Sequence, residues 1–596
     1  MEIKKPKISY TSRDFQTIKN DLINYAKVYY PETYKDFNEA SFGSLMIELV
    51  SYVGDILSFY VDYQSNESFL ETAIEPNNIL KLANQMGYRF RGAPSSTGMC
   101  AFYVIVPAIV AGGAPNPSLI PILKKGTLVS ADGGASFILN SDVDFSKANT
   151  EIKIAEVNGS NSVTSYVMKA YGEVISGEFR TENIAVGDYQ KFLKLRMSDE
   201  NISEIISVKD ADGNEYYEVE YLSQDTVFVP IPNSGYDSGS VPNLLKQKSV
   251  PRRFVTDQDL DGSTFLQFGY GSETQLISSS FPEPDQSVLE LLGQNYFADK
   301  SYDPSVIFKT DKFGIVPSNT TLSVNYRVNN VQNVNAAVGT VTKVTLPIIE
   351  FPKSSYTNKE AASLISNFEV NNEEPIVGFT ELPSIDEIKT RAIDAFSSQN
   401  RAVTRQDYIN LMYRMPAKFG SVKRANVVQD TNSFKRNLNL YVVSEDENGN
   451  LTNSSSSLKK NIKEWLNNYK MINDTVDVLD AVIVNVQINF VVLVEVNKAP
   501  SAILNDCLTA LKQKYSAKFN LGEPFYVSDI YKTLNLVDGV IDTTSVKVSR
   551  KIGAGYSQAE FSVEENTSKD GRYINVPENI ILEIKDLDLD IVGAVE

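Results

Sequence analysis

The chain has 596 residues, a net charge of −19 and a hydrophobic content of 42%, which together indicate a globular protein. At about 100–200 residues per domain, this length predicts roughly three to five domains. The sequence contains no histidine, and its two cysteines, Cys100 and Cys507, lie far apart. Imidazole-based catalytic triads, zinc sites and disulfide frameworks are therefore excluded. The acidic balance also argues against binding to a nucleic-acid backbone, which depends on Lys and Arg.

A membrane location is not expected from the sequence. No stretch approaches the roughly 18 apolar residues that a membrane-spanning helix needs. Residues Met1 to Pro6 include lysines, but no apolar run follows them, so they do not form a secretory signal. We therefore expect a soluble protein that is made in the cytoplasm and has no membrane span.

Three helices are predicted in the first 95 residues. Apolar residues recur at spacings of three and four over 10–30, which is typical of one face of a helix. The same spacing continues over 41–63. A third helix is expected from Pro76 to Met86, with Gly87 as its stop signal.

The helix predicted over 41–63 has an unusually wide apolar face. Its main row follows an unbroken three-four alternation over three heptads, and a second row repeats every seven residues. Three apolar positions in seven need at least two neighbouring helices. These neighbours belong either to this chain alone or, in the sharper hypothesis, partly to other chains. The predicted interface residues are Phe42, Leu45, Met46, Leu49, Tyr52, Val53, Ile56, Phe59, Tyr60 and Tyr63.

From about 98 to 345 the apolar period becomes two, which predicts a strand-rich middle region. A strand is expected at 101–106, and a hairpin is expected to join 124–130 to 135–139. The segment 232–250 is rich in Ser, Gly, Asn and Pro, and is expected to be a surface loop. Further strands are predicted at 151–157, 164–170, 204–209, 215–221 and 225–230, with a final pair at 264–268 and 321–327.

One acidic motif in this region resembles a metal site. Asp257, Asp259 and Asp261, followed by Gly262, copy the first half of an EF-hand calcium loop. The twelfth position is Phe268 instead of the glutamate that closes the coordination sphere. An acidic turn is therefore favoured over a calcium site, and no metal or cofactor is predicted. Whether the three aspartates bind any ion stays open.

The C-terminal third alternates between helices and strands. Capping boxes at Ser384 and Thr404 predict helices over 384–400 and 404–413. Val482 to Val496 alternates in the manner of a long strand with one buried face. Cys507 lies on the apolar stripe of the next helix and is interpreted as core filler, not as a nucleophile. The remaining elements are expected to be strands at 422–429, 437–444 and 544–549, with helices around Trp465 and over 501–519 and 527–534.

These elements predict an α+β multidomain protein with an N-terminal helical bundle segment, β-rich middle domains and C-terminal α+β modules. The expected divisions are a helical oligomerisation region at 1–95, a β-rich region at 96–345 with an inserted subdomain at about 150–250, and α+β domains at 346–480 and 481–596.

Short motifs along nearly the whole chain support a more specific hypothesis. They are Tyr10–Phe15, Phe42–Tyr63, Asn84–Tyr88, Phe268–Gly271, Val316–Arg327, Arg401–Tyr408, Leu521–Pro524 and Val537–Val540. In this order they resemble the J-like baseplate wedge proteins of contractile-tail phages, including the larger T-even-type wedge subunits. The most specific motif is Arg401–Tyr408, which is similar to that family's Ala-x-Thr-x-x-Asp-Tyr helix start. Two features depart from the family: Tyr270 replaces an acid, and Asn329–Asn333 replaces a glycine-rich loop.

The resemblance implies a non-enzymatic structural subunit in the inner wedge ring of a virion tail baseplate, assembled in the host cytoplasm. In such proteins the N-terminal helices of paired copies join a helix of another wedge protein in a trimeric bundle. The resemblance also implies a homodimer or a larger ring, contacts with wedge proteins near the tail tube and sheath, and rearrangement when the tail contracts.

Two other classes of function are left open. One is a β-rich tail adhesin or fibre-like protein that binds glycans, with some of the 31 tyrosines serving as platforms in place of the single Trp465. The other is a carboxylate-based hydrolase, because a pair of acids could lie at catalytic distance among 75 acidic residues.

Overall fold

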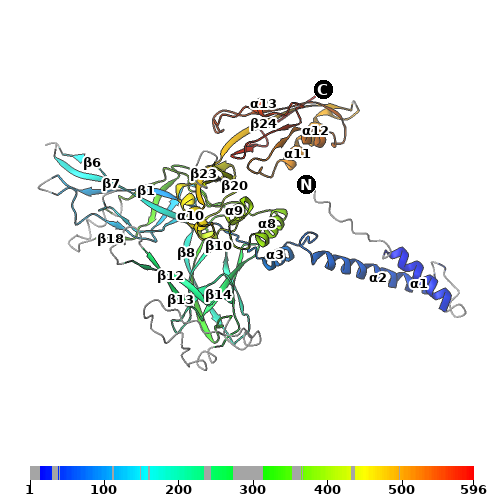
Figure 1. Ribbon diagram of the computed structural model, residues 1–596, viewed down its shortest axis with the longest axis horizontal. Helices are drawn as coiled ribbons and strands as arrows, with labels where there is room; N and C mark the ends of the chain where they lie inside the picture. The colour runs from blue at the N-terminus through cyan, green and yellow to red at the C-terminus, as the bar shows by residue number, and fades with distance from the viewer. Residues whose placement is uncertain are drawn as a thin grey trace. The chain divides into compact units, whose positions relative to one another are not determined.

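The computed structural model describes residues 14–29, 38, 41–109, 113–147, 150–158, 162–233, 243–272, 313–351, 364, 367–430, 437–495 and 497–596 (Figure 1). The chain divides into two compact units. The helical unit comprises Met1–Arg89 and Pro383–Phe396, and the main unit comprises Phe90–Leu382 and Ser397–Glu596. The fold is α+β and multidomain, as predicted. The finer division of the chain at 96, 346 and 481 remains a prediction.

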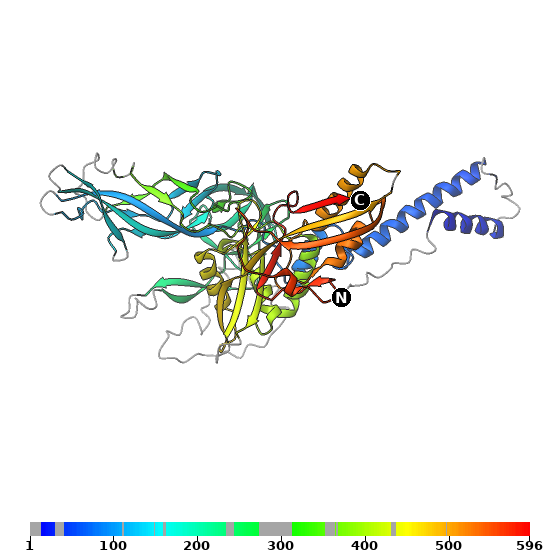
Figure 2. The same ribbon diagram turned by 90° about the horizontal axis from the view of Figure 1, so that it is seen from above.

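The helical unit contains the three predicted N-terminal helices and one helix from much later in the sequence. They are α1 (Phe15–Tyr29), α2 (Phe42–Glu67), α3 (Pro76–Gln85) and α8 (Ile385–Ser398), whose last two residues belong to the main unit. Ser41 starts α2 by accepting a hydrogen bond from the Ser44 N–H at 3.1 Å. α2 runs four residues beyond the predicted end because neither glycine nor proline follows Tyr63 within the helix. α1 lies alongside α2 in both views (Figures 1 and 2).

A buried carboxylate joins the end of α2 to the start of α3. Glu67 is 5% exposed and accepts hydrogen bonds from the Ile74 N–H at 2.8 Å, the Glu75 N–H at 3.2 Å and the Asn78 side chain at 3.0 Å. On α8, the Lys389 ammonium donates to the Ala73 carbonyl at 2.7 Å. The turn between α2 and α3 is therefore held by charged groups from two sides.

The first large sheet of the main unit contains the predicted hairpin. Its strands are β1 (Thr97–Pro107), β3 (Leu128–Ala131), β4 (Ser136–Leu139), β6 (Glu151–Val157), β7 (Val163–Ser176), β17 (Val341–Leu346) and β19 (Glu369–Asn371). Their order is β17-β3-β4-β7-β1-β19, with β6 paired to β7. Phe102, Phe137 and Phe145 are fully buried in its core. A small sheet beside it consists of β2 (Ile122–Leu123), β5 (Val143–Asp144) and β18 (Ile349–Glu350).

The second large sheet contains the two strands predicted at 264–268 and 321–327. Its strands are β8 (Glu178–Val186), β9 (Lys194–Glu200), β10 (Ile202–Lys209), β11 (Glu215–Glu218), β14 (Arg253–Gln258), β15 (Ser263–Phe268) and β16 (Thr320–Val328). The order is β8-β16-β10-β11-β14-β15-β9. β15 pairs with β14 across the short Asp259–Gly262 turn, and β16 lies between β8 and β10.

The loop predicted at 232–250 is wrong for its second half. β12 (Thr226–Pro232) pairs antiparallel with β13 (Asn243–Ser249) as a separate two-stranded sheet. Residues 234–242 lie outside the described residues. The sequence of β13 hides its strand character because polar residues follow the adjacent Leu244 and Leu245 without apolar alternation, and because its pairing partner lies more than ten residues earlier.

The C-terminal third forms two α+β modules. The first contains α9 (Arg405–Tyr413), a 3-10 turn η1 (Ala417–Phe419), β20 (Arg424–Gln429), β21 (Asn437–Glu445), β22 (Leu451–Thr452), α10 (Ser456–Asn467) and β23 (Thr475–Asp480). The second contains β24 (Val482–Val494), α11 (Pro500–Lys514), β25 (Phe525–Tyr526), α12 (Val527–Leu534), β26 (Val540–Arg550), α13 (Val563–Asn566), β27 (Tyr573–Ile574), β28 (Ile580–Glu583) and β29 (Ile591–Val595).

The long strand β24 has the predicted buried face. Its even-numbered residues from Val484 to Val494 are buried, and Val496 lies outside the described residues. Cys507 is fully buried in the same core, as predicted. α11 ends at Lys514, five residues before the predicted end. Directly after this end, the Tyr515 ring stacks on Phe525, with 5.7 Å between the ring centroids.

Candidate functional site

The apolar face of α2 is exposed in the chain taken alone. Nine of the ten predicted interface residues are exposed, and Ile56 is partly buried. Phe42 is 77% exposed, Phe59 64% and Tyr60 61%. The Phe59 ring lies against Tyr63, with 6.2 Å between the centroids and 20° between the planes. The aromatic side chains therefore contact each other along the helix surface instead of packing into a core.

α1 covers a different side of α2. Ser44, Ser51 and Ser58 repeat every seven residues on this side; the first two are buried and the third is partly buried. A Cβ placed on Gly54 would lie 3.2 Å from the Ile18 side chain of α1. These small residues let the two helices approach closely. The side of α2 that its own chain covers is thus the serine row, not the apolar face.

An ion pair links α1 to α2. The Lys19 ammonium of α1 lies 2.7 Å from the Glu48 carboxylate of α2. Both side chains are partly exposed, so the pair contributes about 0–1 kcal/mol to stability. Its main effect is to orient α1.

The exposed apolar surface is wider than the sequence analysis predicted. Val50, Leu57 and Val61 are also exposed, which brings the exposed large hydrophobic residues of α2 to twelve. Their spacings of seven and four residues were the signal that could have identified them. At 100° per residue, the twelve side chains occupy about 200° of the helix circumference. A single packed helix covers roughly half of such an arc, so two further helices are needed.

α2 also has the length and composition of a membrane-crossing helix. The helix is long enough and apolar enough to cross a membrane, and little of its apolar stretch is buried. The expectation that no stretch approaches this apolar length was therefore wrong, because the acidic residues within the helix are few and widely spaced. Length and composition alone do not distinguish a membrane-facing helix from a protein-facing one, since both expose apolar side chains.

The acidic motif in the middle region forms a turn. The Asp257 carboxylate lies 2.8 Å from the Lys194 ammonium, and the Asp261 carboxylate accepts a hydrogen bond from the Ser263 N–H at 3.1 Å. The residues that follow form β15, as the alternation predicted. Within the described ranges, no group of three or more His, Cys, Asp or Glu side chains is placed to hold a metal ion.

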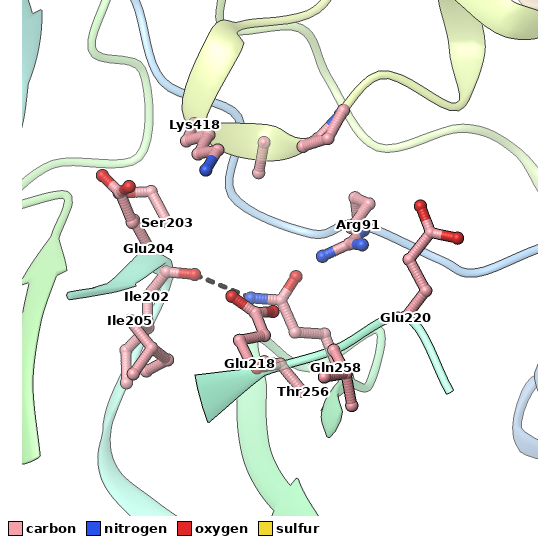
Figure 3. A pocket seen from close by; sticks show the side chains of 13 residues that line it. Arg91, Ile202, Ser203, Glu204, Ile205, Glu218, Glu220, Thr256, Gln258 and Lys418 are labelled. Atoms are coloured by element: carbon pink, nitrogen blue, oxygen red, sulfur yellow. Dashed lines mark hydrogen bonds between the residues drawn. The ribbon is translucent and has the colours of Figure 1, made fainter. Parts of the chain in front are cut away.

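A pocket of about 180 Å³ lies in the main unit where β10, β11 and β14 meet η1 (Figure 3). Its charged groups are mixed, because Arg91 and Lys418 line it together with Glu204, Glu218 and Glu220. The Glu204 carboxylate is already paired with buried Arg327 at 3.3 Å.

The amide of Gln258, which also lines this pocket, is used within the chain. It donates to the Ile202 carbonyl at 2.7 Å and accepts from the Gly92 N–H at 2.8 Å. The Ser95 N–H binds the Ala417 carbonyl at 2.8 Å. These contacts anchor the segment that enters the main unit, and we assign no ligand to the pocket.

Comparison with known proteins points to the helical unit. Residues 14–85 match the family described as "Bacteriophage baseplate protein, N-terminal domain". The matched segment contains α1, α2 and α3, and so carries the whole exposed face. No curated protein sequence matches the chain.

Two solved baseplate structures show a low overall similarity. The anti-feeding prophage baseplate, 6-fold symmetrised, is 9% identical over 98% of each chain, with a TM-score of 0.25. The type VI secretion system TssK-TssF-TssG baseplate subcomplex is 9% identical over 74% of this chain and 96% of that chain, with a TM-score of 0.24. TM-scores at this level carry no structural argument. The N-terminal family match, however, supports a structural role for this chain in a phage baseplate.

Proposed function

We propose that the chain is a structural, non-enzymatic subunit of the inner wedge ring of a contractile phage tail baseplate. α2 bundles with α2 of a second copy and with a helix of another wedge protein. The observation that carries this proposal is the exposed apolar surface of α2, which lies inside the segment that matches a baseplate domain. Exposed apolar patches of this size on soluble proteins mark interaction surfaces.

The energetics favour covering the whole surface. The exposed side chains are already about half buried, so completing their burial contributes about 1 kcal/mol each, half the value for full burial. Association costs about 4–15 kcal/mol in lost freedom of motion. Contact through one or two side chains cannot offset that cost, whereas two neighbouring helices along the length of α2 can.

The remaining parts of the proposal follow from the resemblance of the sequence motifs to J-like baseplate wedge proteins. The C-terminal modules link neighbouring wedges, wedge proteins near the tube and sheath are further partners, and the subunit is assembled in the host cytoplasm. On tail contraction the bundle contacts persist while the connections between domains rotate. The proposed division at residues 95, 345 and 480 supplies these connections.

Light scattering of the purified full-length chain tests the proposal. We expect self-association, or recovery of soluble protein on co-expression with a neighbouring helical tail protein. Leu49→Gln/Val53→Gln should abolish self-association, because it places amides in the centre of the apolar surface. The matched control is Leu536→Gln/Ile552→Gln, which changes two exposed apolar residues of the C-terminal module. A wild-type chain that stays monomeric and gains nothing from any tail partner would contradict the proposal.

Two further measurements separate the alternatives. Glycan-array binding by the full chain would favour an adhesin. Insertion into phosphatidylcholine vesicles, abolished by Leu49→Gln/Val53→Gln, would favour a membrane role for α2. The assembly proposal predicts that neither occurs.

A further inference from the structure

The exposed surface of α2 has two different borders. Along one border lie Glu48, Asp55 and Asp62, which repeat every seven residues. Three positions before each acid lies an exposed apolar residue. These residues, Leu45, Tyr52 and Phe59, form the row next to the acids. Residues three apart lie on the same side of a helix. This acidic row therefore runs between the exposed aromatic side of α2 and the serine row covered by α1.

α2 contains no compensating positive charge. It has neither Lys nor Arg between Phe42 and Glu67. α1 supplies Lys19 to Glu48. Among the residues that the structure describes, Asp55 has no ion-pair partner. All three acids are partly buried, so a helix packed on the aromatic side would bury them further and strengthen their interactions with its own charges.

The opposite border carries no charge. Val50, Leu57 and Val61 are exposed there, and Gly54 lies between them and the serine row. A second copy of α2 can pack along this border without bringing like charges together. Along the acidic border, by contrast, two copies of α2 would set acid against acid.

We propose that the two borders take different partners, and that the acidic border takes a helix from another protein that carries Lys or Arg every seven residues. This inference rests on the proposed function, because it names the chemistry of the second helix in the bundle. The apolar stripe of that helix covers Leu45, Tyr52 and Phe59, and its basic residues meet the acidic row. The uncharged border is left for the second copy of this chain.

A pair of synthetic peptides tests the proposal on the full-length chain. Both are labelled amphipathic helices of about four heptads with the same apolar stripe. One has Lys and the other Glu at the flanking position of each heptad. Fluorescence anisotropy should show the Lys peptide binding about tenfold more tightly than the Glu peptide, with the difference shrinking as salt is raised.

Matched variants test whether the preference for the Lys peptide comes from the acidic row or from the net charge of the chain. Asp55→Asn/Asp62→Asn should reduce the Lys-to-Glu preference to about threefold or less. Asp188→Asn/Asp212→Asn removes the same charge from exposed positions of the main unit, and should leave the preference unchanged. Equal binding of the two peptides, or equal effects of the two variants, would overturn the inference.

Light scattering distinguishes this failure from failure of the proposed function. If neither peptide binds while the wild-type chain self-associates through α2, a second copy covers both borders and only the present inference is lost. If neither peptide binds and the chain remains monomeric with every tail partner, the proposed function itself is contradicted.

Discussion

Glu67 shows how one residue holds α2 in place. Its buried carboxylate accepts hydrogen bonds from the Asn78 side chain and from the Ile74 and Glu75 N–H groups at the start of α3. The Asn78 amide and the Ile74 N–H lower the pKa of this carboxyl below its usual 4.5. The ionised acid is therefore the form that the fold stabilises, and the contribution depends on pH.

Replacing this acid should destabilise the helical unit. Glu67→Gln keeps one acceptor but loses the charge, so we expect a loss of about 1–2 kcal/mol in the free energy of unfolding at pH 7. Because the folded pKa is lowered, the stabilisation is complete above pH 4.5 and is lost as the pH falls through the folded pKa. Urea unfolding of both proteins from pH 7 to pH 3 should show the difference shrinking. Exposed Glu71→Gln is the control, and a pH-independent difference would contradict the assignment.

Gly269 occupies a position where the backbone of another segment leaves no room for a side chain. A Cβ at this position would lie 1.9 Å from the Phe313 carbonyl oxygen, and backbone atoms cannot move aside as a side chain can. Gly269→Ala should therefore lower stability by about 1–3 kcal/mol or more. Gly187→Ala is the matched control, since no atom lies within 4 Å of its added Cβ. Thermal unfolding of the two variants compares them directly, and equal melting temperatures would be inconsistent with the close approach.

At the scale of the element, the pair of α1 and α2 depends on a small residue. Gly54→Ala should be neutral or stabilising, because alanine favours the helix by about 1 kcal/mol and the terminal methyl of Ile18 can shift slightly. Gly54→Leu has the same helical preference but no room, and should displace α1. Hydrogen–deuterium exchange should show faster exchange in α1 for the leucine variant only. Unchanged exchange of α1 in both variants would mean that packing at Gly54 does not hold α1.

Local signals predicted most elements and the hairpin of β3 and β4, but not the long-range strand pairings. The capping box of α9 is formed by Thr404 and Asp407, with the Thr404 N–H 2.8 Å from the Asp407 carboxylate. A capping box joins two residues only three positions apart, so it can be identified from the sequence alone. The partners of β15 and β16 are set by register and burial across long stretches of chain, and periodicity contains no such information. The spacings of Val50, Leu57 and Val61 could have added them to the apolar face, but no sequence pattern shows that their own chain leaves them exposed.

At the scale of the whole molecule, an uncovered apolar surface makes association depend on temperature. Hydrophobic association weakens on cooling, because its driving force is entropic near room temperature. Sedimentation of the full chain should therefore show a larger assembled fraction at 25 °C than at 5 °C, and Leu49→Gln/Val53→Gln should remove the dependence. The preference for the Lys peptide over the Glu peptide should respond to salt more than to temperature, because the two peptides share the same apolar stripe. Assembly that grows on cooling would indicate that polar contacts dominate.

The structure groups Pro383–Phe396 with the N-terminal helices, a grouping that the sequence did not suggest. The polypeptide consequently passes between the two units three times, after Arg89, after Leu382 and after Phe396. A helical unit joined through a single connection would be released by one proteolytic cut. With three connections, a cut at any one of them still leaves the two units joined, because Pro383–Phe396 belongs to the same compact unit as the N-terminal helices and Lys389 donates a hydrogen bond to the Ala73 carbonyl.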